Sequence, residues 1–402
     1  MRIGMILKAR IPPPDIRVEK EAQTLIEAGH EVHLLLERGR GERREETADG
    51  IRFLRGVTMG LLREKWHRYT FSYTFRDPLW HGAIEAFVRD RGIEVLHVHD
   101  LPLVNEAVSV GAARGLPVVA DLHENYPAGL QVWYTSELKK RTIYNYGRWS
   151  RYERSILQRV AAVVVVIEES KERITGLGIP PGKIYVVPNT ASKKREEIPI
   201  DRTITDRYRD HFVISYIGGF APHRGLDVTV QALPLLRERI PGIRLVLVGD
   251  RNEGYRRYLA QLASGLHCTD VLEMTGWQPF EKIWSYIEAS DVCLVPHARN
   301  PHTDTTIPHK IFQYMMVGKP VVVSDCPPLR RVIDDSGGGL HFRYDDPRDL
   351  ADKILSIHES ENLRTRISQA GRAAFLDRYH WDHTSRELVQ LYRDLKETMN
   401  GE

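Results

Sequence analysis

A lysine stands where a predicted helix begins, in a setting that suits the binding of phosphate. Residues 304–333 read DTTIPHKIFQYMMVGKPVVVSDCPPLRRVI. After Pro308 the polar residues give way to apolar residues with helical spacing, and Gly318 follows as a helix stop. A helix N-terminus presents unpaired N–H groups and a partial positive charge, to which Lys310 adds a full charge. The segment therefore predicts an anion site, with an ordinary capped helix and a surface lysine as the alternative.

A second segment with the same preference lies at residues 218–225, which read GGFAPHRG. It follows an apolar run at 212–217 that predicts a strand, and it precedes a helix predicted at 226–239. Paired glycines allow the backbone to approach a ligand closely, and the planar fork of Arg224 suits phosphate oxygens. A glycine pair alone is weak evidence for a phosphate site. The evidence is stronger here because this segment and the segment around Lys310 follow one another along the chain.

Histidines and acids gather after two predicted strands in the first half of the chain, at 95–99 and 118–121. The polar residues at or beyond these strand ends are His99, Asp100, Asp121, His123, Glu124 and Asn125. Alternating apolar strands and helices predict a parallel sheet, and ligands gather at the carboxyl ends of such strands. A buried histidine is often only structural, but two strand ends with a histidine and an acid each exceed what a core requires.

A further group of potential metal ligands is His297, His302, Asp304 and His309. Their spacing in a proline-rich loop is irregular and forms no preorganised pair, so the sequence predicts no metal site. The chain has three cysteines, which are widely spaced and odd in number. This pattern supports neither a disulfide framework nor a CxxC metal site, and it fits a reducing compartment.

The composition limits the class of protein. A chain of 402 residues is too long for one ordinary core and predicts two domains, and 42% hydrophobic with 28% charged residues is typical of a soluble globular protein. With 57 basic and 54 acidic residues the charge is nearly balanced, which argues against a nucleic-acid partner. The N-terminal apolar run is too short for a signal peptide, and no run of 18 apolar residues occurs. We therefore expect a cytoplasmic protein.

Periodicity predicts the elements that must position these residues. Further strands are predicted at 3–7, 32–36, 51–54, 163–167, 184–187, 245–249, 271–275 and 289–296, and further helices at 103–114, 139–158 and 383–399. The charged segments 38–49 and 192–210 lack periodicity and are interpreted as a surface stretch and a linker. Segments 61–76 and 139–158 interleave basic and aromatic residues, and they are interpreted as a half-buried helix and a helix with a solvated face, respectively. Contact with a membrane surface is the alternative for both.

Residues 310–315 (KIFQYM), the GKPVV of 318–322 and Ser324-Asp325 resemble the donor-site helix of a known enzyme family. It is the family of retaining glycosyltransferases with the GT-B fold (glycosyltransferase family 4, group 1). Other segments resemble this family in the right order along nearly the whole chain. They are residues 13–22, 28–32, 97–100, 121–127 and 218–225.

The resemblance implies an α/β protein of two Rossmann-like domains that face one another across a cleft. Its N-terminal acceptor-side domain would span 1–190, the linker 191–210 and the nucleotide-sugar-binding domain 211–379. The C-terminal helix, within 380–402, would return to the first domain. The implied reaction moves a hexose-type sugar from a nucleotide-diphosphate-sugar donor to an acceptor hydroxyl, with retention and without a metal. No cofactor is implied, and the acceptor is a glycan, a lipid-linked or a small molecule, as in polysaccharide, glycolipid or other glycoconjugate synthesis.

The resemblance also implies roles for single residues. His123 would face the donor sugar, while Arg224 and Lys310 would stabilise the departing diphosphate. The donor-binding positions are Gly218, Gly219, Arg224, Gly276, Trp277, Thr305, Thr306, Ile307, Lys310 and Gln313. Trp277 has two interpretations, stacking on the nucleotide base or packing in the fold.

The chain departs from the family pattern at three of these positions. Thr305 and Gln313 stand where the family carries glutamates, and Gly219 stands where many members carry a basic residue. Gln313 still accepts a hydrogen bond but without charge assistance. Two alternatives therefore stay open, a non-catalytic nucleotide-sugar-binding protein of the same fold and a sugar-nucleotide epimerase. Peripheral contact with the inner face of a membrane also stays open.

Overall fold

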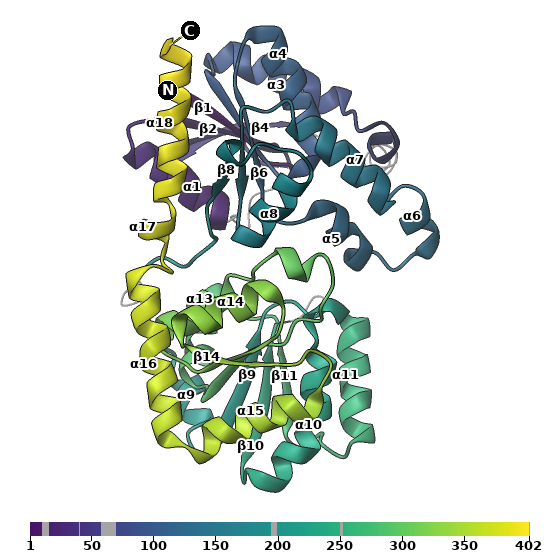
Figure 1. The fold of residues 1–402 in the computed structure, drawn as a ribbon, viewed down its shortest axis with the longest axis vertical. Coiled ribbons are helices and arrows are strands. Elements are labelled where there is room, and N and C mark those ends of the chain that lie inside the picture. Colours follow the sequence, from purple (N-terminus) through teal and green to yellow (C-terminus); the bar gives the residue numbers. More distant parts are fainter. Residues whose placement is uncertain (10–15, 40, 58–69, 194–198, 250–251, 402) are drawn as a thin grey trace. The chain divides into compact units, whose positions relative to one another are not determined.

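The computed structural model describes the chain except for residues 10–15, 40, 58–69, 194–198, 250–251 and 402. The chain divides into two compact units (Figure 1). Unit 1 comprises Met1–Pro188 with Ser385–Glu402, and unit 2 comprises Asn189–Thr384. The two units meet between Pro188 and Asn189, and again between Thr384 and Ser385, whereas the sequence placed a separate linker at 191–210.

Unit 1 is built on a sheet that has, within the described residues, the strand order β3-β4-β2-β1-β5-β6-β7-β8. Its strands are β1 (Arg2–Ile6), β2 (Glu31–Glu37), β3 (Glu45–Ala48), β4 (Ile51–Val57), β5 (Val95–His99), β6 (Val118–Leu122), β7 (Ala162–Val165) and β8 (Ile184–Val186). The ladders are parallel, apart from that between β3 and β4. Strands β5, β6 and β7 are buried along their whole length, as expected of parallel strands covered on both faces.

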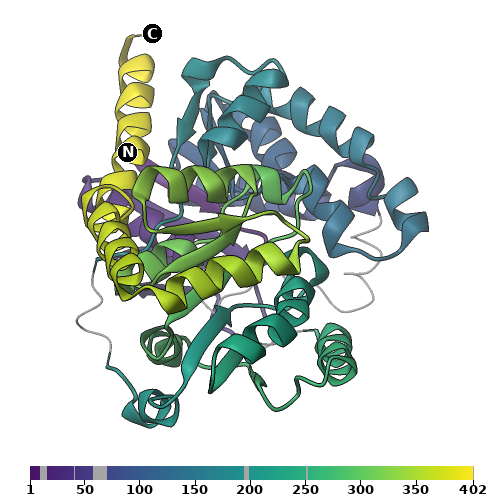
Figure 2. The same ribbon diagram turned by 60° about the horizontal axis from the view of Figure 1, so that its bottom comes forward.

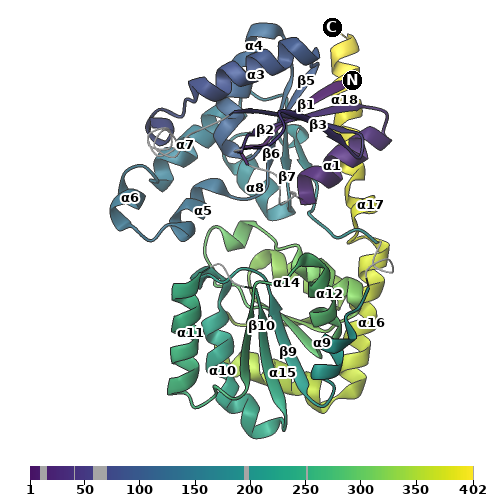
Figure 3. The ribbon, with the colours of Figure 1, turned by 180° about the vertical axis from the view of Figure 1, so that it is seen from behind.

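Helices cover both faces of this sheet (Figures 1 and 3). They are α1 (Ile16–Glu27), α3 (Pro78–Arg91), η1 (Leu101–Leu103), α4 (Val104–Arg114), α5 (Tyr126–Trp133), α6 (Glu137–Arg141), α7 (Tyr146–Leu157), α8 (Glu168–Gly176), η2 (Pro181–Lys183) and α18 (Arg386–Gly401). Connections of the strand–helix–strand type place the carboxyl ends of the parallel strands at one edge of the sheet.

Unit 2 is a second parallel sheet with helices on both faces, and its described strands follow the order β11-β10-β9-β12-β13-β14. The strands are β9 (Phe212–Ile217), β10 (Ile243–Val248), β11 (Leu272–Gly276), β12 (Val292–Val295), β13 (Val321–Ser324) and β14 (Gly339–Phe342). The helices are α9 (Arg202–Arg207), η3 (Pro222–Arg224), α10 (Leu226–Arg239), α11 (Glu253–Gly265), α12 (Phe280–Glu288), η4 (Thr303–Thr305), α13 (Lys310–Val317), α14 (Pro327–Ser336), α15 (Pro347–Glu359), α16 (Glu361–Asp377) and α17 (Trp381–Thr384).

The two helices on which the sequence argument depends are confirmed. Helix α10 has the predicted bounds, and α13 begins at Lys310 and ends at Gly318, which adopts the left-handed conformation with φ of +76°. A residue with a Cβ atom is disfavoured in this conformation, so glycine is the natural helix stop there.

One local prediction is wrong, and the segments interpreted as a surface stretch and a linker each contain a short element. The single helix predicted at 139–158 is two helices, α6 and α7, because the Asn145 side chain accepts a hydrogen bond from Arg148 N (3.0 Å) and starts a new helix. Segment 38–49 contains the edge strand β3, which pairs antiparallel with β4. The linker contains helix α9, which Asp201 caps and whose Ile204 is buried. Segment 61–76 lies mostly outside the described residues.

The C-terminal helix α18 belongs to unit 1, as the resemblance implied. It passes the N-terminus of the chain (Figures 1 and 2) and buries Leu388, Leu391 and Tyr392. The Tyr185 hydroxyl of β8 donates a hydrogen bond to Asp394 at 2.6 Å. Among the helices that the structure describes, none is long and apolar enough to cross a bilayer.

Candidate functional site

The amine of Lys310 is enclosed where α13 begins, beside the carboxyl end of β9. Lys310 is 6% exposed, and its Nζ atom lies 3.6 Å from the centroid of the Tyr216 ring. A Cβ atom added to Gly218 would lie 2.5 Å from Nζ, and Gly218 has a φ of +144° that other residues rarely adopt. The backbone conformation therefore favours glycine at the first position of the predicted turn, and the Lys310 amine occupies the space beside it.

Arg224 is brought to the same strand ends by the tight turn that joins β9 to α10. Gly225 follows it with a φ of +63°, and a Cβ atom there would lie 1.9 Å from the carbonyl oxygen of Pro296. One arm of the Arg224 guanidinium donates to His297 Nε2 at 3.1 Å. Burial and the charge of Arg224 hold the pKa of His297 well below its usual range, so its imidazole is neutral and can accept this bond.

These two cations lack an acidic partner within the part of the chain that the structure describes. Burial, followed by the charge of Arg224, lowers the pKa of Lys310 well below its usual 10.5. Burial and the same neighbouring cations lower the pKa of His223 to about 3. Unit 2 therefore has an amine and a guanidinium at the ends of β9 and β12 whose charged forms a bound anion would stabilise.

The positions at which the chain departs from the family pattern also lie in this region. Gln313 is 6% exposed on the first turns of α13, and no hydrogen bond of its side-chain amide is found among the described residues. Thr305 Oγ donates to Pro301 O at 2.6 Å, and Thr306 Oγ donates to His302 O at 2.9 Å. Both threonines can therefore accept a hydrogen bond from a ligand, while their hydroxyl hydrogens are directed into the loop.

The remaining predicted donor-binding residues differ in their surroundings. Trp277, directly after β11, is 63% exposed, so of its two interpretations packing in the fold is wrong. Gly276 has a φ of +75°, and its carbonyl accepts a hydrogen bond from Gly249 N. A Cβ atom at Gly219 would meet nothing within 4 Å. Ile307 is buried. The binding roles of these residues stay predictions.

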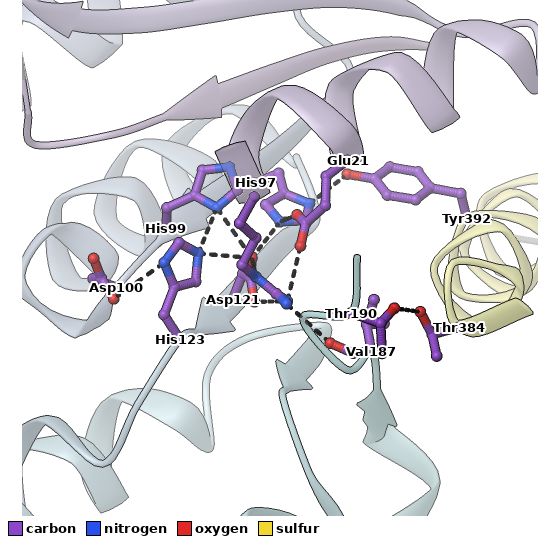
Figure 4. Close-up of polar contacts among 11 residues, drawn as sticks. Glu21, His97, His99, Asp100, Asp121, His123, Val187, Thr190, Thr384 and Tyr392 are labelled. Atoms are coloured by element: carbon purple, nitrogen blue, oxygen red, sulfur yellow. Dashed lines mark hydrogen bonds and ion pairs between the residues drawn. The ribbon is translucent and has the colours of Figure 1, made fainter. Parts of the chain in front are cut away.

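Unit 1 contains a buried ion-pair network in the region where the sequence predicted a site (Figure 4). Arg17 NH2 lies 2.8 Å from Glu21 Oε1 and 3.0 Å from Asp121 Oδ1, and Arg17 NH1 donates to Val187 O at 2.9 Å. Burial acts to raise the pKa of Asp121, but Arg17 and His123 outweigh it and hold that pKa well below its usual range. Burial raises the pKa of Glu21 to about 8, against the opposing effect of Arg17.

Three histidines complete the network. His97 and His99 lie two residues apart on β5 and therefore on one face of the sheet, and His99 is the register partner of Asp121 on β6. Asp121 Oδ2 lies 3.0 Å from His99 Nδ1 and 3.1 Å from His123 Nε2. His97 Nδ1 lies 2.8 Å from the hydroxyl of Tyr392 on α18. The predicted residues His99, Asp121 and His123 are thus brought together.

Four side chains of this network have the chemistry of a metal site. They are Glu21, His97, His99 and Asp121, whose ligand atoms lie within 4.8 Å of one another. The Arg17 guanidinium already contacts both carboxylates, so a metal ion placed among them would be repelled by a fixed positive charge. The arrangement therefore fits an internally compensated network better than a metal site. Asp304, one of the potential metal ligands in the proline-rich loop, forms an ion pair with Arg299.

Roles for Arg17, Glu21 and Tyr392 were not predicted from the sequence. Arg17 and Glu21 are spaced i, i+4 on α1, next to the buried Val18 and Ala22, so the inward face of this helix contains a charged pair. Such a pair is normally solvated, and its partner Asp121 is distant in sequence. The sequence signal that could have revealed this pair is Asp121 at the end of a buried strand, because a buried carboxylate requires a cation from another element.

Two protein-family models match the sequence of the chain. The model described as "Glycosyl transferase 4-like domain" matches residues 14–190, and the model described as "Glycosyl transferases group 1" matches residues 197–374. The chain belongs to the group 1 glycosyltransferases.

Curated and solved proteins agree with this family. A "phosphatidyl-myo-inositol mannosyltransferase" of Mycolicibacterium smegmatis is 24% identical over 410 residues, which cover 100% of this chain and 95% of that protein. Sucrose-phosphate synthase from Thermosynechococcus elongatus superimposes with a TM-score of 0.77 at 20% identity, over 99% of both chains. HepE of Anabaena, solved in complex with UDP, has a TM-score of 0.71 at 14% identity, over 100% of both chains. These neighbours show the GT-B fold for this glycosyltransferase.

The first prediction concerns the glycine pair of the turn. Gly218→Ala is expected to lower the free energy of unfolding by about 1–3 kcal/mol, since it combines a strained backbone with a contact to the enclosed Lys310 amine. Gly219→Ala, the matched control, is expected to change it by no more than about 0.5 kcal/mol. Urea unfolding of both variants measures the difference. Equal costs would show that the lysine does not depend on Gly218.

The second prediction concerns the pH dependence of stability. Because the pKa of Glu21 is about 8 in the folded state and near 4.5 when unfolded, the folded protein binds an extra proton between these values. Stability therefore falls as pH rises through this window, by roughly 1.4 kcal/mol per pH unit for one proton. In Glu21→Gln, the decline between pH 5 and 8 is expected to be shallower by this amount.

Glu27→Gln, an exposed substitution on the same helix, is the control for Glu21→Gln. Its profile of unfolding free energy against pH is expected to run parallel to that of the wild type. A Glu21→Gln profile that also runs parallel would contradict the proton assigned to Glu21.

Proposed function

We propose that the chain transfers a hexose-type sugar from a nucleotide-diphosphate-sugar donor to an acceptor hydroxyl, with retention at the anomeric carbon and without a metal ion. The observation that carries the proposal is the pair of cations, Lys310 and Arg224, that no described acid compensates at the ends of β9 and β12. Membership of the group 1 family supports the reaction class.

Glycosyl transfer develops negative charge on the departing diphosphate, so fixed donors near its oxygens stabilise the transition state. Lys310 supplies a point charge and Arg224 a planar fork with one arm on His297. A diphosphate also restores the charged form of the Lys310 amine, because an adjacent anion raises a pKa that burial and Arg224 lower. Two such cations supply the charge that a divalent ion supplies elsewhere, which supports metal-independent chemistry.

The donor's other groups are assigned to the remaining predicted residues. Trp277 is exposed and presents a ring on which a base can stack, and the Gln313 amide is available to a ribose hydroxyl. His123 hydrogen-bonds the transferred sugar. Retention is the mechanism of the family that the sequence resembles. Structures of HepE contain UDP or UDP-glucose, which supports a nucleotide donor of this kind for the present chain.

For the acceptor we propose a glycan, lipid-linked or small molecule in glycoconjugate synthesis, in the cytoplasm or at the inner face of a membrane. The mycolicibacterial relative is named for a phosphatidyl-myo-inositol acceptor, which supports a lipid. Helices α5–α7 expose Trp133, Leu138 and Tyr146 next to the basic end of α6. Exposed rings combined with cations suit an anionic lipid surface.

The substituted acids favour one rival function, a non-catalytic nucleotide-sugar-binding protein of the same fold. Gln313 lacks the charge of the family glutamate, and Thr305 directs its hydroxyl hydrogen into the loop. Such a protein binds a nucleotide sugar but does not cleave the bond between its sugar and its diphosphate. Donor hydrolysis or transfer above the background rate would exclude this rival.

The donor site is tested by thermal shift with UDP, GDP and ADP and their sugars. At a hundred times the dissociation constant, a bound nucleotide should stabilise the wild type by about 2.7 kcal/mol. Lys310→Met and Arg224→Ala are expected to abolish the shift, whereas Arg239→Ala, an exposed site on α10, should retain it. No shift with any nucleotide, or an undiminished shift in both site variants, would contradict the proposal.

Membrane contact is tested separately by vesicle flotation. The wild type is expected to float with vesicles that contain anionic phospholipid and less so as salt rises, because salt screens exposed charges. Leu138→Ser combined with Arg141→Glu should weaken flotation, and Arg366→Glu on α16 should not. Equal flotation with neutral vesicles, or none with either, would contradict this part of the proposal.

A further inference from the structure

The ring of His123 lies next to a carboxylate at each of its two nitrogens. Nε2 is 3.1 Å from Asp121 Oδ2, and Nδ1 is 3.8 Å from Asp100 Oδ1 (Figure 4). The side chain of His123 is 18% exposed and that of Asp100 is 35% exposed, whereas Asp121 is fully buried. Nε2 also lies 3.1 Å from Nδ1 of the neutral His99 ring, so this side of the His123 ring is bonded inside the network, and the Nδ1 side faces Asp100 close to solvent.

The backbone holds Asp100 in a conformation that its residue type avoids. Asp100 has φ 64° and ψ 157°, a region that essentially only glycine populates. Its N–H donates to the carbonyl of Asp121 at 2.8 Å, which ties the end of β5 to β6. This strain costs on the order of 1–3 kcal/mol and persists only where the surroundings impose it. It places a second carboxylate beside His123.

Asp121 is kept charged from the opposite side. Arg17 contacts both of its oxygens, at 3.0 Å from NH2 and 3.4 Å from Nε, and Val187 O fixes a third guanidinium nitrogen. A buried carboxylate with a cation in two contacts stays ionised. It can therefore accept the Nε2–H of His123 as a carboxylate.

We infer that the ring of His123 stays in the imidazolium form, because Asp121 and Asp100 keep both of its nitrogens protonated. It then acts as a charged hydrogen-bond donor through Nδ1 and is no general base. That its target is an oxygen of the donor sugar or phosphate rests on the proposed function. Asp121, Asp100 and Arg17 are positioning residues, because they act through the histidine.

The other titratable groups of the network are consistent with this charge. Burial lowers the pKa of His123, but the carboxylates of Asp100 and Asp121 outweigh it and raise that pKa to about 10. Burial lowers the pKa of His99 to about 3, so this neighbour stays neutral. The described charged and titratable groups that face the ring or its partners come from four places. They are Arg17 and Glu21 on α1, His97, His99 and Asp100 at β5, Asp121 on β6, and Tyr392 on α18.

The inference predicts a different role for His123 than its type suggests. An unpaired histidine near neutral pH exchanges its proton and can serve as a base. A ring flanked by two carboxylates keeps its protons, and its contact with a substrate oxygen is a charge-assisted bond, roughly twice as strong as a neutral one. Replacement of His123 by Gln would preserve a donor but remove this charge.

The test is the protonation state of His123, measured by NMR on protein with 15N-labelled histidine and assigned by comparison with His123→Gln. In the wild type, both ring nitrogens should resonate together, as in an imidazolium, from pH 6 to pH 9. In Asp100→Asn, the titration midpoint should drop by roughly one to three pH units, the effect of one nearby opposite charge. Tyr392→Phe, the control, removes the bond to His97 and should leave the midpoint unchanged.

A neutral His123 ring in the wild type at pH 7, or a midpoint that Asp100→Asn does not move, would overturn the inference. Asp100 is chosen over Asp121 because its partly exposed side chain can be replaced without leaving Arg17 unpaired. The NMR readout needs no substrate. Its failure is therefore distinct from failure of the proposed function, which loss of the nucleotide thermal shift would show.

Discussion

The amine of Lys310 is enclosed by the Tyr216 ring and the Gly218 backbone, and its nearest described charge is the cation Arg224. Burying an ammonium group without an acid is unfavourable, and folding alone gains nothing from it. The glycine of the turn, the left-handed turn at Gly225 and the start of α13 at Lys310 all bring positive charge to this point. The proposed binding of a nucleotide diphosphate rests on this enclosed amine and on the neighbouring Arg224.

In unit 1, by contrast, the buried charges have partners of opposite charge within the protein. Arg17 and His123 compensate the carboxylates of Asp121 and Asp100 within the protein, and Tyr392 joins α18 to this network through His97. The charges of this network balance without a ligand. The network holds one partly exposed ring, that of His123, in a defined orientation.

The sequence predicts most of the fold because the decisive signals are local. The helix from Lys310 to Gly318 and the helix after Arg224 are specified by apolar spacing and glycine stops, and both are confirmed. The break between α6 and α7 was missed because one asparagine cap overrides a continuous polar–apolar pattern. The Arg17–Asp121 pair was missed because it joins residues 104 positions apart, which no local pattern specifies. The charge states of the candidate site residues could not be predicted from the sequence, because they depend on burial and on partners from other elements.

The most direct test of the central claim is a crystal structure of the protein with the nucleoside diphosphate that gives the largest thermal shift. The account predicts pyrophosphate oxygens within hydrogen-bond distance of Lys310 Nζ and of the Arg224 guanidinium, beside the amides of Gly218 and Gly219. A nucleotide bound elsewhere, or a pyrophosphate that leaves Lys310 on the Tyr216 ring with no phosphate contact, would contradict it.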